Sequence, residues 1–179
     1  PWQVVQTSWT GTQFELPNEG EPTIAIKAWM TEDATRKLLQ KSGQNLDELR
    51  KTAKRKDFKP VLLGTRTSLQ VEVDKTSQST ANVLALLPGS ENPDEAVIYT
   101  AHHDHLGMDM SSDEKDRIYN GAKDNAAGVA SVLAIAKAFK MASSPPKRSI
   151  LFAFVGAEEQ GLLGSAYFAR YPTFEPGKI

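Results

Sequence analysis

All three histidines of this 179-residue chain lie within four positions, in the stretch YTAHHDHLGMD at residues 99–109. They follow the apolar run AVIYTA and surround one aspartate, Asp104. The chain has no cysteine, so imidazole nitrogens and carboxylate oxygens are the donors it can offer to zinc. Taken alone, the cluster is also typical of a solvated polar loop. This stretch therefore leaves a metal site and a surface loop as alternatives.

Two other groups of polar residues occupy comparable positions. Asp124, in NGAKDNAAG, comes directly before a predicted helix, and Glu158 and Glu159 follow the apolar run SILFAFVGA. Each group has a simpler alternative, because an aspartate there can cap a helix and two glutamates can lie on an exposed turn. In an α/β fold, however, ligands bind at the carboxyl ends of the strands. All three groups are predicted to lie at the edge of the sheet where these carboxyl ends meet.

The second half of the chain predicts alternating strands and helices. ANVLALLPG and AVIYTA predict a pair of strands, and SILFAFVGA (149–157) predicts a buried strand. GLLGSAYFARY predicts a helix. Residues 126–142 predict another, with one apolar face made of Val129, Val132, Leu133, Ala136 and Phe139. This order favours an α/β layer with helices covering a sheet.

The first region, residues 1–75, predicts a smaller unit. PTIAIKAW (22–29) and SLQVEV (68–73) predict strands, and residues 31–43 predict a helix with Thr31 as N-cap and Gly43 as C-cap. A second helix should begin at Asn45, which stands at capping-box spacing from Glu48. The polar run DKTSQST (74–80) is the predicted seam. We therefore predict domains at 1–75 and 76–179.

Composition excludes several classes of protein. The net charge of −1 gives no electrostatic footprint for nucleic acid or for an anionic membrane. The absence of cysteine excludes disulfides and thiolate catalysis. No apolar run approaches the roughly 20 residues of a membrane span. The start has neither a signal-peptide pattern nor an initiator Met, which suggests that the chain begins inside a longer one.

Together, AHHDHLG, NGAKDNAAG and FAFVGAEEQGLLGS, in this order, resemble the zinc aminopeptidase family with two co-catalytic zinc ions, which also contains glutamate carboxypeptidases. The pattern covers roughly residues 81–167. The resemblance implies an α/β three-layer sandwich with a mixed, mostly parallel sheet, of the phosphorylase/hydrolase-like aminopeptidase type and here incomplete. Less specifically, the first region resembles the later part of the small α+β or β protease-associated domain that many members carry as an insertion.

The resemblance also implies a role for each candidate residue. Asp124 is expected to bridge two zinc ions, with His102 completing the ligands of one ion and Glu159 those of the other. Asp104, two residues after His102 as in the family's pattern, is expected to orient that imidazole. Glu158 is expected to be the general base for a zinc-bridging hydroxide that attacks the peptide bond.

Further expectations follow from the same resemblance. The family typically has a cis peptide bond after the bridging aspartate, here Asp124–Asn125. His103 and His105 receive no role.

The ligand set appears incomplete by the family's standard. Each ion has three protein ligands in the family, and no Asp or His occurs in this chain after Asp124. We therefore expect a fragment of the enzyme that is a poor peptidase by itself. Its uncovered apolar sheet edge favours dimerisation or swapping of elements.

The favoured function is an aminopeptidase that acts on peptides outside the cytoplasm, secreted, periplasmic or at the cell surface. A carboxypeptidase of the same family, a glutaminyl cyclase-like transferase and a non-catalytic binding module remain as alternatives. The presence of Glu158 argues against the last, because a decayed site has no reason to retain its base.

Overall fold

The computed structural model describes residues 2, 5, 11–24 and 26–179. By the contacts between its residues, the chain divides into two compact units. The first comprises the described residues of Pro1–Thr12 and of Glu19–Thr76, and the second comprises Gln13–Asn18 and Ser77–Ile179. That the first unit is part of a protease-associated domain stays a prediction.

Helix α2 (Glu32–Lys41) begins where the sequence predicts. The side chain of its N-cap, Thr31, accepts a hydrogen bond from the backbone N–H of Ala34 at 3.2 Å. The helix ends one residue earlier than expected, with Ser42 and not Gly43 as C-cap. The N-cap Thr31 therefore predicted the start of this helix correctly, whereas Gly43 predicted its end only to within one residue.

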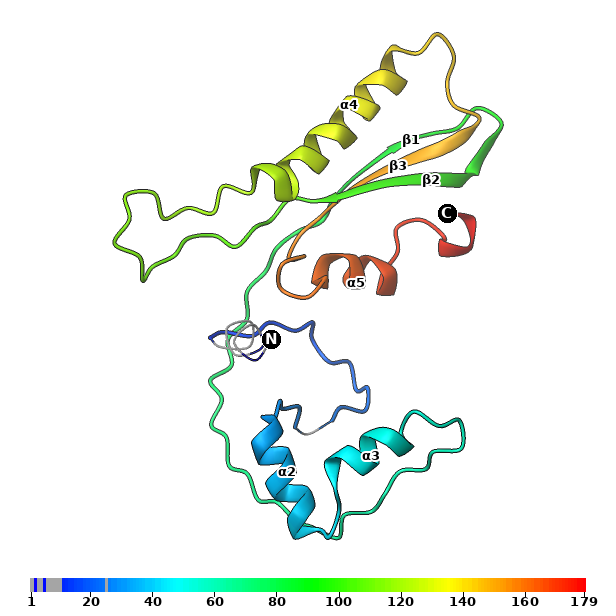
Figure 1. The fold of residues 1–179 in the computed structure, drawn as a ribbon. Coiled ribbons are helices and arrows are strands. Elements are labelled where there is room, and N and C mark those ends of the chain that lie inside the picture. The colour runs from blue at the N-terminus through cyan, green and yellow to red at the C-terminus, as the bar shows by residue number, and fades with distance from the viewer. Residues whose placement is uncertain (1, 3–4, 6–10, 25) are drawn as a thin grey trace. The chain divides into compact units, whose positions relative to one another are not determined.

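Helix α3 (Leu46–Thr52) forms half of the predicted capping box (Figure 1). Asn45 Oδ1 accepts from the N–H of Glu48 at 3.1 Å, as expected. The Glu48 side chain does not reach back to the cap and bonds Lys51 Nζ at 2.8 Å instead. This ion pair is exposed, so its contribution to stability is small.

Both strands predicted in the first unit are wrong. Residues 68–73 form no strand, and neither do residues 22–24 and 26–29. Ala25 lies outside the described residues. The alternating side chains Leu69, Val71 and Val73 are 58%, 71% and 66% exposed. An alternating pattern supplies a strand with an apolar face but not with a partner, and an unpaired strand is not stable alone.

The second unit is built on a three-stranded mixed sheet in the order β1 (Val83–Leu87), β3 (Arg148–Val155), β2 (Asn92–His102) (Figure 1). β2 runs parallel to β3, and β1 runs antiparallel to it. The predicted pairing of β1 with β2 is therefore wrong. β3 is the most buried of the three strands, so it takes the central place.

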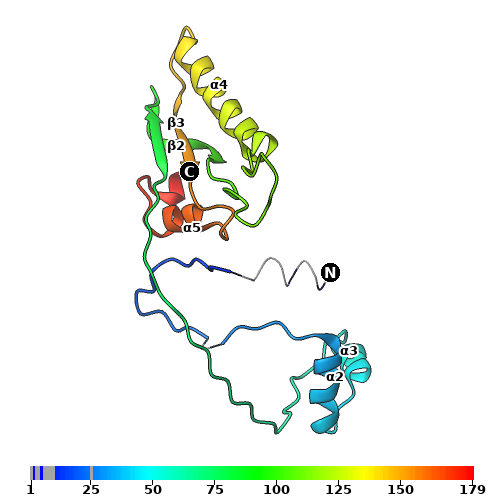
Figure 2. The same ribbon diagram turned by 90° about the vertical axis from the view of Figure 1, so that its left-hand side faces the viewer.

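Helix α4 (Ala127–Met141) lies along one face of this sheet (Figures 1 and 2). Its Val132 packs in a buried cluster with Ala101, Ile150 and Phe152. The predicted apolar face is right except for Leu133, which is 55% exposed. Ile135 packs against the core together with the remaining predicted residues Val129, Ala136 and Phe139.

Helix α5 (Leu163–Arg170) lies on the opposite side of the sheet (Figure 1). Alternate residues of β3 face this side, and Leu151 and Ala153 among them are only 3% and 1% exposed. Since β3 is buried on both faces, the second unit has the predicted helix–sheet–helix layering. The short turn η2 (Pro176–Lys178) follows α5.

Ser149 fastens the end of the sheet farthest from the polar clusters. Its side chain is fully buried, donates to the carbonyl of Pro93 at 2.7 Å and accepts from the N–H of Gly89 at 3.0 Å. These bonds lie where the register of β2 against β3 shifts between Asn92 and Ala96. A hydroxyl at this position thus satisfies backbone groups that the irregular ladder leaves open.

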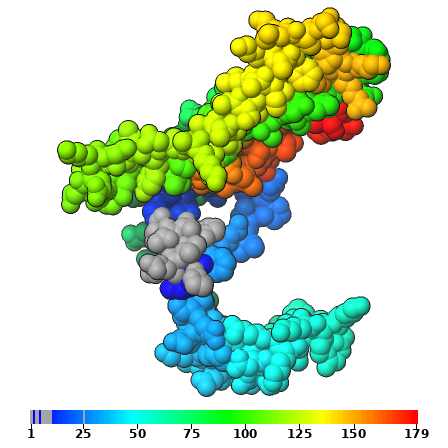
Figure 3. Space-filling view, turned by 45° about the horizontal axis from the view of Figure 1, so that its top comes forward, coloured from blue at the N-terminus to red at the C-terminus, as the bar shows by residue number. Residues whose placement is uncertain are grey.

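The segment between β2 and α4 projects beyond the sheet (Figures 1 and 3). It ends in the irregular turn η1 (Ala122–Ala126), which leads directly into α4. Among the described residues, no helix has the length and apolar character that crossing a bilayer requires.

Candidate metal centre

The three polar clusters of the sequence meet at the carboxyl ends of the two parallel strands. His102 is the last residue of β2 and pairs in register with Val155 of β3. The glutamates follow β3, and Asp124 lies in η1. One donor atom each from His102, Asp124 and Glu159 lies within 4.8 Å of the other two. The structure therefore brings together the residues predicted to bind metal.

Both ring nitrogens of His102, which is 9% exposed, have a partner. Nδ1 lies 3.1 Å from the backbone carbonyl of Asp104, and Nε2 lies 2.8 Å from Oδ1 of Asp124. A carbonyl can only accept, so Nδ1 carries a hydrogen. Nε2 then faces a carboxylate oxygen, and this pair requires a proton or a metal ion to hold it.

The surroundings of His102 favour positive charge. Burial is the largest single influence and lowers the pKa of its imidazole, whereas the hydrogen bonds to Asp124 and to the Asp104 carbonyl raise it. The carboxylates of Glu158 and Asp104 act in the same direction, and the net pKa is raised above its ordinary value. Glu158 Oε2 lies 3.7 Å from Nε2. The same carboxylates that hold a proton here would attract a divalent cation.

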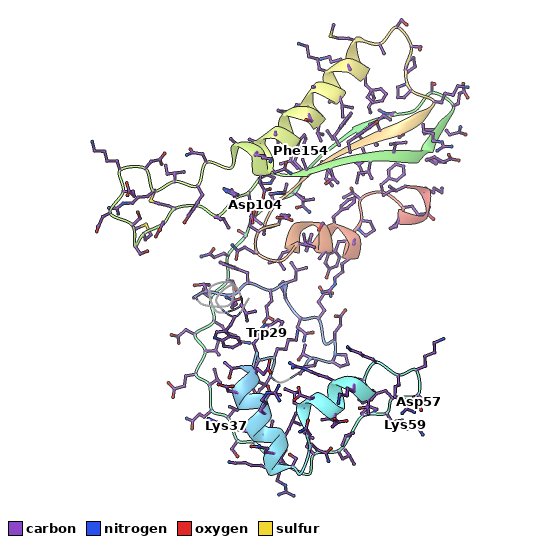
Figure 4. All side chains as sticks on the ribbon, in the orientation of Figure 1. Trp29, Lys37, Asp57, Lys59, Asp104 and Phe154 are labelled. Atoms are coloured by element: carbon purple, nitrogen blue, oxygen red, sulfur yellow. The ribbon has the colours of Figure 1, made fainter. Side chains whose placement is uncertain are left out.

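Asp104, which is labelled in Figure 4, acts on two neighbours through different groups. Its carbonyl orients His102, whereas its carboxylate lies 3.7 Å from Nδ1 and contributes charge rather than a hydrogen bond. Oδ2 accepts from the backbone N–H of Glu159 at 3.2 Å. Oδ1 is buried without a hydrogen-bond partner among the described residues. The Asp104 carboxylate therefore holds the backbone of Glu159, a contact that the sequence did not indicate.

Asp124 is not the helix cap that its position allows. Asn125 Oδ1 accepts from the N–H of Gly128 at 3.0 Å, so the cap-type bond belongs to Asn125. The Asp124 side chain is 69% exposed and directs its carboxylate to His102. The peptide bond between Asp124 and Asn125 is cis, as the family resemblance implies.

The glutamates lie in a loop that Asn82 holds at both ends. Asn82 Oδ1 accepts from the N–H of Gly156 at 3.1 Å, and its Nδ2 donates to the carbonyl of Gly164 at 2.8 Å. Side-chain exposure is 32% for Glu158 and 18% for Glu159. An acidic pair on a simple exposed turn would be more accessible and would not be clamped in this way. The loop is built to position these carboxylates.

Replacement of Gly164 by alanine should damage this loop. An alanine Cβ at this position would lie 2.1 Å from the carbonyl oxygen of Gly156 and 2.6 Å from Oδ1 of Asn82. We expect the free energy of unfolding of the full-length protein to fall by about 1–3 kcal/mol, the usual range for overpacking. Chemical denaturation measures this loss.

Gly177→Ala is the matched control, because a Cβ there meets no atom within 4 Å. Equal stability of the two alanine variants would contradict the close approach at Gly164.

The two histidines without a predicted role differ in the structure. His103 Nε2 lies 3.1 Å from the carbonyl of Ala81, and among the described residues no hydrogen bond joins the ring to a predicted site residue. His105 Nδ1 lies 2.7 Å from Oε1 of Glu159, so the expectation of no role overlooked a direct contact with a predicted ligand. The available signal was a third imidazole immediately after the His102–Asp104 pair.

The donor set fits zinc. One imidazole and two carboxylates are ligands that zinc accepts in proteins, and donors to one tetrahedral zinc ion lie about 3.3 Å apart. The observed convergence within 4.8 Å needs only small adjustments, whether one ion or a bridged pair is bound. Oδ1 of Asp104, buried and without a hydrogen bond among the described residues, lies beside the site 3.7 Å from His102 Nδ1.

Comparison with known proteins shows the family of the chain. Residues 82–178, more than half of the chain, match the model of peptidase family M28. The chain is 39% identical over 90 residues to a probable zinc metalloprotease of Pyricularia oryzae, across 50% of this chain and 17% of that protein. It is 33% identical over 111 residues to aminopeptidase NAALADL1 of Mus musculus, across 60% of this chain and 13% of that protein.

A solved structure, of a peptidase M28 precursor from Shewanella amazonensis SB2B, is 38% identical over 50% of this chain and 18% of its own, with a TM-score of 0.41. The chain thus spans less than a quarter of the length of each of these relatives. The family match covers the whole of the candidate metal centre, from the Asn82 clamp to the loop with both glutamates. The chain belongs to peptidase family M28.

Proposed function

We propose that the full-length protein is a zinc-dependent aminopeptidase that hydrolyses peptide bonds and releases N-terminal residues. The observation that supports it most is the convergence of His102, Asp124 and Glu159 at one sheet edge with Glu158 beside them. The names of the relatives, a probable zinc metalloprotease and an aminopeptidase, point in the same direction. Action outside the cytoplasm, secreted, periplasmic or at the cell surface, is part of the same proposal.

In this proposal two zinc ions share the site. Asp124 would bridge them, His102 would hold one and Glu159 the other. Zinc, when bound, would lower the pKa of a coordinated water to about 7 and polarise the peptide carbonyl. The exposure of Asp124 supports a bridging role, because a carboxylate that contacts His102 through one oxygen retains a second oxygen for another partner.

Glu158 would move the proton. Its carboxylate lies 3.7 Å from His102 Nε2, so it is within the site, yet its donor atoms are not in the convergent group. A carboxylate that is near the metal but not bound to it can accept a proton from the attacking water and deliver it to the leaving amine. Adjacent glutamates thus divide the work, with Glu159 as ligand and Glu158 as base.

Peptide hydrolysis by the full-length protein, with and without a chelator, tests the function. We expect cleavage of peptides with a free N-terminus, loss of activity with the chelator and recovery on addition of zinc. N-acetylated peptides should be poor substrates, whereas C-amidated peptides should be cleaved normally. The reverse preference would identify a carboxypeptidase, and chelator-insensitive cleavage would exclude the zinc mechanism.

A further inference from the structure

His105 contacts a proposed metal ligand, although no role was predicted for it from the sequence. We propose that His105 is a positioning residue that holds the Glu159 carboxylate in the orientation needed to bind metal. The inference rests on the proposed zinc site and adds a residue to it.

The contact itself fixes the direction of the hydrogen bond. His105 Nδ1 lies 2.7 Å from Oε1 of Glu159, and the two side chains are 23% and 18% exposed. An ionised carboxylate only accepts, so Nδ1 carries the hydrogen in this pair. The short distance is typical of a hydrogen bond to a charged acceptor. Because a carboxylate has two oxygens, this bond leaves the other oxygen for a metal ion.

The imidazole of His105 is itself held in place. The ring of Tyr119 meets it edge-on, with centroids 6.4 Å apart and planes at 79°. The backbone of Gly121 also lies close to the ring, because a Cβ added there would stand 3.0 and 3.1 Å from two ring carbons of His105. Gly121 also has a φ of +61°, which favours glycine. The ring therefore has little freedom to turn away from Glu159.

Glu159 is consequently fixed at two points by one short segment. Its backbone N–H donates to Oδ2 of Asp104, and its side chain accepts from His105. Without the second bond the glutamate side chain could adopt several rotamers. The end of β2 thus supplies one donor, His102, and the residues directly after it orient a second donor that lies more than 50 residues away in sequence.

His105 does not belong to the ligand group itself. The convergent donors found among the described residues come from His102, Asp124 and Glu159 alone. An outer hydrogen bond to a metal ligand typically changes metal affinity 10–100-fold, whereas removal of a ligand removes the ion. These two roles therefore give different zinc titrations.

The experiment is a zinc titration of the full-length protein against a chromogenic chelator. His105→Phe retains a ring beside Tyr119 but removes the donor, and we expect zinc to bind about 10–100-fold more weakly with unchanged stoichiometry. His105→Asn should restore most of the affinity, because its amide N–H can take the place of Nδ1–H. His103→Phe is the matched control and should bind zinc normally, since the His103 ring bonds the Ala81 carbonyl and, among the described residues, no hydrogen bond joins it to a predicted ligand.

A double-mutant cycle separates positioning from a general structural effect. In a Glu159→Gln background, His105→Phe should cause no further loss of zinc affinity, because the residue acts through Glu159. Additive losses would overturn the inference. If His105→Phe does not fold, as judged by circular dichroism, His105→Ala is the second donor-free variant, and the same affinities are expected.

The remaining outcomes are equally decisive. Wild-type zinc affinity in His105→Phe would overturn this inference alone. Loss of a full zinc equivalent in both His105→Phe and His105→Asn would make His105 a ligand and also overturn it. Failure of the wild-type protein to bind zinc would overturn the proposed site and this inference with it.

Discussion

Glu158→Gln in the full-length protein is expected to lower kcat for peptide hydrolysis at least about a hundredfold and to leave the zinc content nearly unchanged. A positioned general base contributes about 10²–10⁴-fold, and glutamine cannot accept the proton. The Glu158 carboxylate lies beside His102 but outside the group of convergent donors, so its loss should not release metal. Steady-state kinetics and metal analysis of the same preparation measure both quantities.

Glu159→Gln should behave in the opposite way. This neighbour belongs to the convergent donors, so its replacement should deplete one zinc ion as well as activity. Glu175→Gln is the inert control, because Glu175 is exposed and its ion-pair partner among the described residues is Lys178, outside the site. Zinc lost from Glu158→Gln in parallel with activity would contradict the division between base and ligand.

Residues 1–179 taken alone are expected to bind zinc weakly and to hydrolyse peptides poorly. No Asp or His occurs after Asp124, and the described residues provide three convergent donors. If Asp124 is shared by two ions, each has two protein ligands, whereas catalytic zinc sites normally use three plus water. Zinc titration, a peptide-hydrolysis assay and the mass of the particle in solution check this together.

Two tightly bound zinc ions and normal turnover in a monomer of this length would contradict that expectation. Such a result would mean that another side chain completes the ligand set. His105, whose Nδ1 lies 2.7 Å from Oε1 of Glu159, would then be the first residue to test by mutation. Full activity confined to a dimer would instead indicate that a second copy completes the site.

The sequence by itself determined most of the second unit's elements. The apolar periodicity of residues 126–142 and the unbroken apolar run of 149–157 predicted α4 and β3, because each pattern matches one backbone period and needs no knowledge of distant residues. Three ordered motifs also predicted His102, Asp124 and Glu159 as metal ligands, and in the structure one donor atom of each lies within 4.8 Å of the other two. The N-caps Thr31 and Asn45 could also be predicted from local sequence, since a cap accepts from N–H groups two or three residues away.

The tertiary structure alone decided which strands pair and which distant side chains meet. The strand predictions at 22–29 and 68–73 failed, and β3 inserted between β1 and β2, because strand pairing depends on distant segments that a local pattern does not specify. Asp104 orients His102 through its carbonyl and holds Glu159 through its carboxylate, and His105 reaches that glutamate across more than 50 residues of sequence. Sequence spacing can show that a residue is a good donor. Which acceptor that donor meets is fixed only when the parallel strands bring their carboxyl ends to the same edge of the sheet.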